Sequence, residues 1–141
     1  MADNAPAFEA LGSFIETLKE HNIKYKLYDD RPVVSLPYDG NHFSDLDFIF
    51  IFDDDGGSVA VKVYTIKEFE KRQLPNAYKF CNNMNFKFRW VRFYIDNDME
   101  LTADMDAVIG GDTIGEECFE LLARCVSIVD DVCEILESYP L

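Results

Sequence analysis

Sequence signals for a membrane span, a disulfide framework or a zinc site are missing from this chain. No stretch approaches the roughly 20 apolar residues that a membrane-spanning helix needs. The four cysteines form no C-x-x-C pair, and three fall in one expected helix, where buried thiols behave as small hydrophobes. The N-terminus, MADNAPAFEA, has neither the basic region nor the apolar run of a secretory signal. We therefore expect a cytoplasmic protein without disulfides or a membrane partner.

Residues that carry catalysis or hold metals are also scarce. Only two histidines are present, so a histidine-dependent nucleophile or metal centre is not indicated. The sequence GGDT at 110–113 precedes a helix but lacks the lysine and the glycine spacing of a phosphate loop. Asp96, Asp98 and Glu100 alternate like the start of a calcium loop, but Leu101 stands where the turn glycine belongs. We expect a hairpin turn there, and no catalytic, metal or cofactor site.

Acidic residues outnumber basic ones by 27 to 13, and the excess is unevenly distributed. The net charge is −8 over residues 1–61, +6 over residues 62–92 and −12 over residues 93–141. A surface this acidic repels nucleic acid and anionic membranes over most of its area, so we expect neither as a partner. The basic block either neutralises acidic neighbours within the fold or forms a local exception to this repulsion.

Apolar and aromatic residues are abundant, at 48% and 14% of the chain, which is typical of a globular protein. No repeat or linker divides the sequence, so we expect a single domain over residues 1–141, long enough to bury a core. Apolar residues recur at helical spacing from Pro6 to about Glu20, which predicts the first helix.

Four strands are predicted after this helix. Alternating apolar and polar residues indicate strands at 23–28 and 33–38, and Pro37 favours an edge position because it lacks a backbone donor. The stretch 46–52 is apolar on both faces, as expected for a strand that is covered on both sides. A fourth strand begins at Val59, after the hairpin loop DDDGGS.

The remaining helices are indicated by capping boxes and by composition. The spacing in Thr65–Glu68 predicts a helical turn, and the main second helix is expected from Pro75 to about Asn85. A second capping box at 113–116 opens a long last helix. Without counting Ala123, twelve of the nineteen residues from 118 to 136 are apolar, more than the three or four per two turns that one packing face uses. This helix is therefore either central to the domain or in contact with another subunit.

A hairpin separates the second and last helices. The loop Asp96-Asn97-Asp98 would put Ile95 opposite Met99 and Phe93 opposite Leu101, which keeps all four apolar side chains on one face. The complete order is then α-β-β-β-β-α-β-β-α. That order predicts an α+β fold with helices packed on an antiparallel sheet.

Residues 76–107 carry the most distinctive motifs. They are the asparagine-rich helix end CNNMN, the aromatic strand RWVRFYID and the return strand MELTADM. In these motifs the chain resembles the YbjN family, bacterial proteins described as sensory transduction regulators. In element order it resembles the type III secretion chaperones, whose fold this family shares. The resemblance implies no catalytic or cofactor residue, and the chaperone fold implies dimers that hold an extended segment of a partner.

One strand offers a candidate partner-binding surface. If Val91 and Phe93 face the helices, then Trp90, Arg92 and Tyr94 line the other face of the sheet. Tryptophan, tyrosine and arginine are enriched at interaction hot spots. We therefore predict these three residues as a partner-binding site; the alternative is an amphipathic face that is inert or covered by another element.

Together these observations favour a non-enzymatic, protein-binding domain that acts as a regulator or chaperone-like factor, through a homodimer and with an unknown protein client. Two alternatives stay open. One is a structural or stress-related assembly protein without a client. The other is a small-molecule-binding domain or enzyme with a pocket under the first helix. A tight pocket with convergent polar groups would favour the small molecule, and a shallow apolar groove would favour the protein client.

Overall fold

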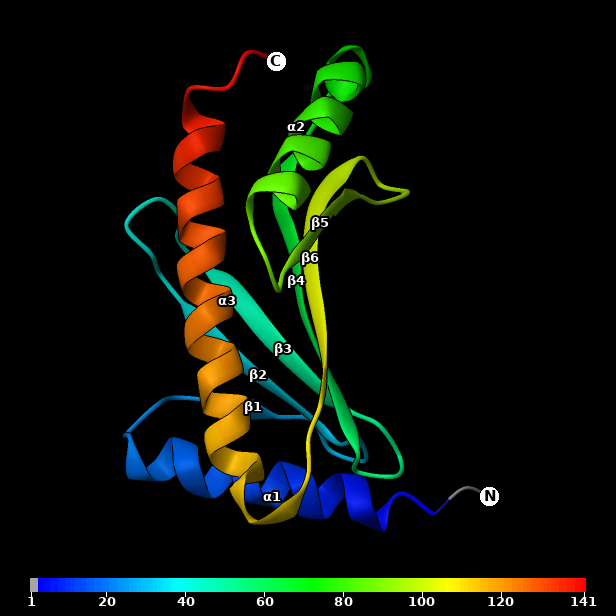
Figure 1. Ribbon diagram of the computed structural model, residues 1–141, viewed down its shortest axis with the longest axis vertical. Coiled ribbons are helices and arrows are strands. Elements are labelled where there is room, and N and C mark those ends of the chain that lie inside the picture. Colours follow the sequence, from blue (N-terminus) through cyan, green and yellow to red (C-terminus); the bar gives the residue numbers. More distant parts are fainter. Residues whose placement is uncertain (1–2) are drawn as a thin grey trace.

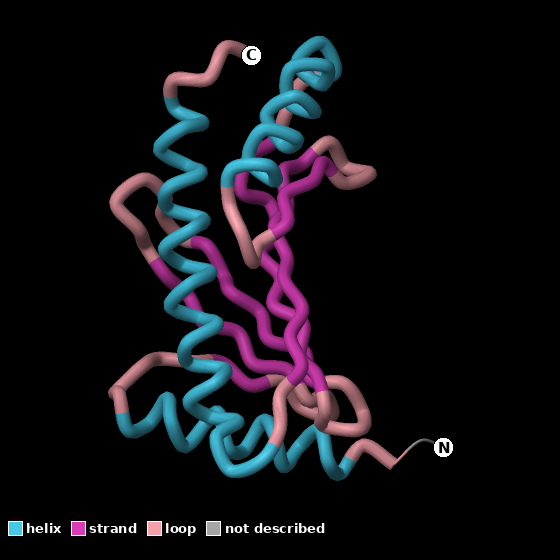
Figure 2. Tube along the Cα trace, in the orientation of Figure 1, coloured by secondary structure: helices cyan, strands magenta, loops and turns pink. Residues whose placement is uncertain are grey.

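The computed structural model describes residues 3–141, and its elements follow the predicted order (Figures 1 and 2). The helices are α1 (Ala5–Glu20), α2 (Leu74–Lys87) and α3 (Ile114–Glu137), with short 3-10 turns η1 (Lys71–Gln73) and η2 (Gly111–Thr113) before the last two. The strands are β1 (Lys26–Leu27), β2 (Val33–Tyr38), β3 (Leu46–Phe52), β4 (Ser58–Glu68), β5 (Arg92–Ile95) and β6 (Glu100–Val108). The predicted α+β fold is confirmed.

All six strands form one antiparallel sheet in the order β1-β2-β3-β4-β6-β5. The long helix α3 runs beside this sheet. The helix α1 crosses the N-terminal end of α3, and α2 lies near the C-terminal end of α3 (Figure 1). Gly115 allows the α1–α3 crossing, because a Cβ there would collide with the Thr17 hydroxyl and the Ser13 carbonyl. Within residues 3–141, no helix has the length and apolarity that crossing a bilayer requires.

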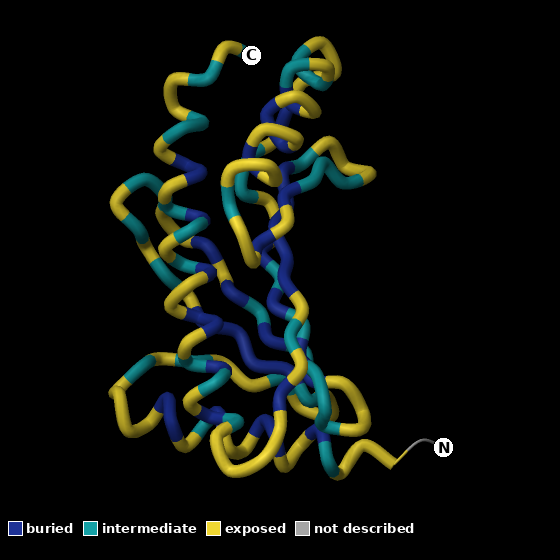
Figure 3. The backbone as a smooth tube through the Cα atoms, in the orientation of Figure 1, coloured by how far each residue is buried: buried dark blue, intermediate teal, exposed yellow. Residues whose placement is uncertain are grey.

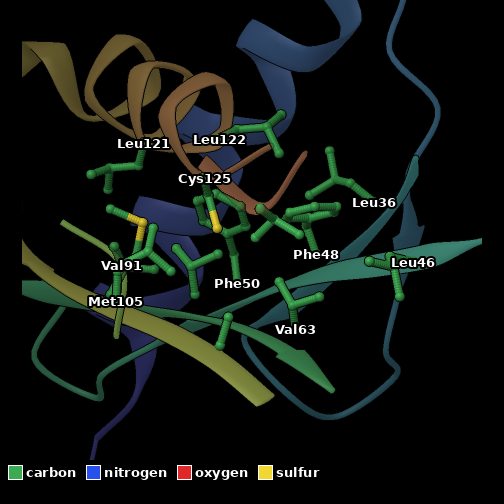
Figure 4. Packing of buried hydrophobic residues seen from close by; sticks show 14 of the residues in the cluster. Leu36, Leu46, Phe48, Phe50, Val63, Val91, Met105, Leu121, Leu122 and Cys125 are labelled. Atoms are coloured by element: carbon green, nitrogen blue, oxygen red, sulfur yellow. The ribbon is translucent and has the colours of Figure 1, made fainter. Parts of the chain in front are cut away.

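The core lies between α3, α1 and one face of the sheet. Phe50 of β3 stands opposite Val61 of β4, and its ring centroid lies 4.7 Å from that of Phe14 in α1. Figure 4 shows the strand residues and Cys125 of α3 pointing toward one another. Both phenylalanines are fully buried, so truncating either to alanine should cost about 3–5 kcal/mol.

Two strand expectations need correction. The predicted strand at 23–28 shortens to Lys26–Leu27. The strand β3 is not covered on both sides, because Asp47 is exposed and Ile49 and Ile51 are only half-buried. The physical reason is that the helices leave the second face of β3 to solvent.

At Pro37, β2 lacks a partner on one side, because β1 pairs only with Ser35 and Val34. Pro37 therefore has the unpaired edge position that proline prefers.

The predicted helical turn at Thr65–Glu68 is wrong. These residues extend β4, whose end pairs with Leu101 and Glu100 of β6 after an irregularity between Val63 and Lys67. Cross-strand pairing therefore overrides the local capping pattern. The capping box forms later, between Glu70 and Gln73 in η1. The Thr113 pattern does mark the start of α3, but the Thr113 side chain makes no capping hydrogen bond.

The β5–β6 hairpin keeps the predicted face but not the predicted register. Ile95 stands opposite Leu101, and Phe93 opposite Ala103, so the strands are shifted by two residues. The Asp96 N–H donates to the Glu100 carbonyl, and Met99 adopts a left-handed conformation with φ of 61°. The three-residue loop is therefore 97–99. A shift of two preserves which side chains face inward, so the apolar pattern does not detect it.

Candidate protein-binding surfaces

Arg92 and Tyr94 lie, as predicted, on the sheet face opposite the helices, whereas Val91 and Phe93 are buried in the core. Arg92 stands across from Asp104 of β6, and its Nε and Nη2 atoms each donate to one carboxylate oxygen at 2.8 Å. The Arg92 guanidinium also lies over the Tyr94 ring, 5.3 Å from its centroid. Asp104 itself is only 3% exposed, whereas the Arg92 side chain is exposed to solvent.

The environment of Asp104 favours its ionised form. Burial alone would raise the pKa of this carboxyl, but the hydrogen bonds and the charge of Arg92 outweigh burial and lower the pKa below its usual value. The same contact raises the pKa of Arg92, chiefly through the hydrogen bond to Asp104. At neutral pH this face therefore presents a guanidinium whose position is set by a buried carboxylate.

Trp90 does not share that face, which corrects the prediction of one three-residue surface. The Trp90 ring lies 5.0 Å from the guanidinium carbon of Arg124, a residue of α3, and 5.5 Å from that of Arg89. The backbone at Trp90 has φ of 76°, and β5 begins only at Arg92. The strand alternation that the prediction assumed therefore does not extend to Trp90. Its side chain lies on the helix side, 53% exposed.

The outward side chains of β3, β4, β5 and β6 form what we call the open sheet face. Its cross-strand rows follow from the register, since paired residues point to the same side. The row through Ile49, Lys62, Asp104 and Arg92 mixes apolar and charged groups of both signs. The face includes Asp47, Ile49, Ile51, Ala60, Lys62, Tyr64, Arg92, Tyr94, Asp104, Asp106 and Val108. Val108 is 88% exposed and Tyr64 47%.

A second apolar surface, the α3 groove, runs along α3 beside the ends of α1 and β2. It is an open depression of about 240 Å³, and no charged side chain lines it. Its lining residues are Ile23, Tyr38, Phe119, Leu122, Ala123, Val126 and Ser127. The sequence indicated this groove only as an apolar excess on the last helix. The contribution of Ile23 and Tyr38 could not be inferred, because both residues are far from α3 in the sequence.

Two polar cavities differ in whether their charged side chains contact one another. A cavity of about 400 Å³ lies near the C-terminal end of α3, beside the β2–β3 connection. There the His42 ring nitrogens contact Glu134 at 2.9 Å and Glu137 at 3.0 Å, and these contacts, led by the hydrogen bond to Glu137, raise the pKa of His42. Among residues 3–141, the charged groups that line the cavity of about 410 Å³ beside α1 are Glu9 and Asp55, and no basic side chain lines it.

Asp96, Asp98 and Glu100 do come together, with one oxygen of each within 4.8 Å of the others. The oxygens of Asp96 already accept hydrogen bonds from the backbone N–H groups of Asp98 and Glu100 and from the Thr102 hydroxyl. Desolvation opposes ionisation of Asp96, but these donors outweigh it and lower its pKa. The arrangement is that of a hairpin turn that the Asp96 side chain holds together.

Comparison with known proteins identifies both the fold and the family. The YbjN family, described as "putative bacterial sensory transduction regulator", matches residues 13–136. The crystal structure of YbjN from E. coli, described as a putative transcription regulator, superposes with a TM-score of 0.66 at 13% identity, covering 87% of each chain. A chain of the ExsC–ExsE complex superposes with a TM-score of 0.56 at 14% identity, covering 94% of each chain. Comparison with curated protein sequences gave no match.

Proposed function

The chain belongs to the YbjN family, and we propose that it is a non-enzymatic protein-binding domain that acts as a regulator or chaperone-like factor. In this proposal two copies associate through the open sheet face, and the α3 groove receives a segment of a client protein. The family match and the secretion-chaperone-like fold, both expected from the sequence, support a regulatory or chaperone-like role. The dimer and the client are the parts that experiments must establish.

The α3 groove is the observation that carries the proposal. It is open and apolar, and none of its lining residues, which include Phe119, Leu122 and Val126, carries a charge. A small-molecule site usually combines an apolar cavity with a few convergent polar groups. The cavity at His42 has polar groups, but Glu134 and Glu137 engage both nitrogens of its imidazole. A peptide segment with apolar side chains therefore fits this surface better than a polar metabolite does.

The open sheet face supports the dimer through its composition. A two-fold interface must be complementary to itself, because the same patch contributes from both subunits. The face has apolar groups at Ile49 and Ile51, and charges of both signs at Lys62, Arg92 and Asp106. Opposite charges from two copies can therefore face each other around an apolar centre. The ExsC–ExsE structure, a complex of two proteins with this fold in one of its chains, supports partner binding in general.

Affinity capture from the native cell tests the client. A Val126→Arg variant places a charge in the α3 groove, and Asp131→Arg places the same charge on an exposed position of α3 outside it. We expect a protein retained by the wild type and by Asp131→Arg to be lost with Val126→Arg. Retention by Val126→Arg at the wild-type level would remove the groove as the client site.

A further inference from the structure

The outward side of α2 carries aromatic residues that the fold does not use. Ala77, Phe80 and Met84 face the core, whereas Tyr78 is 55% exposed and Phe86 is 94% exposed. Phe86 follows Tyr78 by eight positions, so the two residues are about 80° apart around the helix and about 12 Å apart along its axis. Figure 3 shows the exposed turns of α2 on the side away from the sheet. Single exposed apolar side chains are common on protein surfaces, so these two aromatics indicate a partner only together with the charges around them.

The same surface is basic in a strongly acidic protein. Residues 71–91 contain five bases and no acid, so they contribute +5, whereas the rest of the chain contributes −19 of the total −14. Lys79, Lys87 and Arg89 are all exposed, and in the described part of the chain no carboxylate lies within 4.0 Å of their nitrogens. We call the exposed residues Tyr78, Lys79, Asn82, Phe86, Lys87 and Arg89, of α2 and of the segment just after it, the α2 face.

The sequence left two explanations for the basic residues of 62–92, and one was neutralisation by acidic neighbours within the fold. This explanation holds for two arginines of that block. Arg92 pairs with Asp104, and Arg72 pairs with Glu70 at 2.7 Å. It does not account for Lys79 and Lys87, which directly follow the exposed aromatics Tyr78 and Phe86 in the sequence. Exposed positive charge and exposed apolar surface therefore coincide on α2, and within residues 3–141 no carboxylate pairs with either lysine.

We infer that the α2 face binds an acidic segment of a partner protein, with apolar side chains of that segment packing on Tyr78 and Phe86. The inference rests on the protein-binding function proposed above and adds a second contact to the α3 groove. Carboxylates of the segment would face Lys79 and Lys87, while its apolar groups cover the two aromatics. Opposite charge steers such a segment to the one basic region of an otherwise acidic surface.

Other occupants fit this surface less well. The 14 residues of α2 span about 21 Å, and the chain beyond residues 71–91 is acidic, so a nucleic acid that continues past the helix meets repulsion. An anionic membrane would meet the same acidic surroundings. Two α2 faces from a pair of identical subunits would place lysines against lysines. A short acidic peptide can end within the basic region and avoid all three conflicts.

Selection from a library of random short peptides tests the inference on the full chain. The wild type should enrich peptides that combine Asp or Glu with aromatic or aliphatic residues. The double variant Lys79→Glu/Lys87→Glu should lose this preference, and the Kd of the best acidic peptide should rise about tenfold or more. Phe86→Ser should weaken the same peptide. The control Lys24→Glu/Arg31→Glu has the same change in charge on exposed positions elsewhere and should retain the preference.

Several results would overturn the inference. They are a wild-type selection without acidic enrichment, unchanged acidic enrichment on Lys79→Glu/Lys87→Glu, and displacement of the peptide by duplex DNA or by phosphatidylserine vesicles. Dissociation of a dimer by Phe86→Ser, measured by sedimentation, would show that the α2 face is a subunit contact. The wild type could instead select peptides without an acidic preference, and Val126→Arg could abolish their binding. That result would support the proposed function and exclude only the α2 face as a binding site.

Discussion

Arg92 and Asp104 form a two-pronged ion pair across β5 and β6, with both N–O distances at 2.8 Å and the carboxylate buried. Removing the arginine leaves a buried acceptor without its main donors, so Arg92→Ala should destabilise the fold by about 1–3 kcal/mol. Asp104→Asn/Arg92→Ala should restore part of that loss, because no buried charge remains. Denaturant unfolding at pH 7 measures both effects. Equal stability of Arg92→Ala and wild type would show that the pair contributes nothing.

The same pair predicts how stability depends on pH. Because the pKa of Asp104 is lowered in the folded state, its contribution is fully present above its unfolded pKa of about 3.9 and is lost as the pH falls through the folded value. Asp104→Asn should therefore lose less stability than the wild type when the pH falls below about 4. Thermal melts across acidic pH make this comparison, and parallel curves for the two proteins would contradict it.

Asn85 joins the end of α2 to β5 by two hydrogen bonds with the backbone of Phe93. Its Nδ2 donates to the Phe93 carbonyl at 2.9 Å, and its Oδ1 accepts the Phe93 N–H at 2.8 Å. Asn85→Ala should cost about 1–3 kcal/mol, because both backbone groups lose their partner. Asn82→Ala is the matched control, since Asn82 is exposed on the same helix. Denaturant midpoints that fall equally for the two variants would remove the special role of Asn85.

Trp90 and Tyr94 should separate in their effects on association. Tyr94 lies on the open sheet face, so Tyr94→Ala should weaken the proposed dimer, whereas Trp90→Ala should leave the dimer intact because Trp90 lies on the helix side. Concentration-dependent unfolding distinguishes lost association from lost folding. Dissociation by Trp90→Ala with Tyr94→Ala unaffected would place the subunit contact on the helix side.

The cysteines should be inert, and neither reductant nor chelator should shift the melting temperature. Burial raises the pKa of Cys118 and Cys125 to about 12, and that of Cys81 and Cys133 to about 11. At pH 7 each of the four cysteines is therefore almost entirely in the thiol form, which reacts slowly with alkylating reagents. Mass spectrometry after brief alkylation should find the folded protein unmodified and the urea-unfolded protein modified. Rapid native modification, or a drop of several degrees with either reagent, would show otherwise.

Much of the fold could be predicted, because the spacing of apolar residues and the turn-forming residues between segments indicate the helices and strands. The helical spacing after Pro6 and the alternation around Phe50 each correspond to an observed element. The register of the β5–β6 hairpin could not be predicted, since a shift of two residues leaves every side chain on the same face. The capping pattern at Thr65–Glu68 predicts a helical turn wrongly, because pairing with β6, which is not local in sequence, decides the structure of this segment.

The candidate surfaces were predictable only in part. Arg92 and Tyr94 follow from strand alternation, but Trp90 does not, because a left-handed residue interrupts the alternation and its contact with Arg124 spans distant parts of the chain. The α3 groove needs Ile23 and Tyr38 beside Val126, a meeting that only the tertiary structure brings about. The α2 face was visible beforehand as a basic block, without its exposed aromatics.

Sedimentation velocity at micromolar concentration tests the proposed dimer most directly, when the wild type is compared with Ile49→Lys/Ile51→Lys. The wild type should sediment at twice the 16.3 kDa protomer mass. The double variant should sediment as a folded monomer, because each lysine places a charge at the apolar centre of the open sheet face. A wild-type protein that remains a 16.3 kDa monomer at all concentrations tested would contradict a function exercised through a dimer. A variant that stays dimeric would place the interface elsewhere.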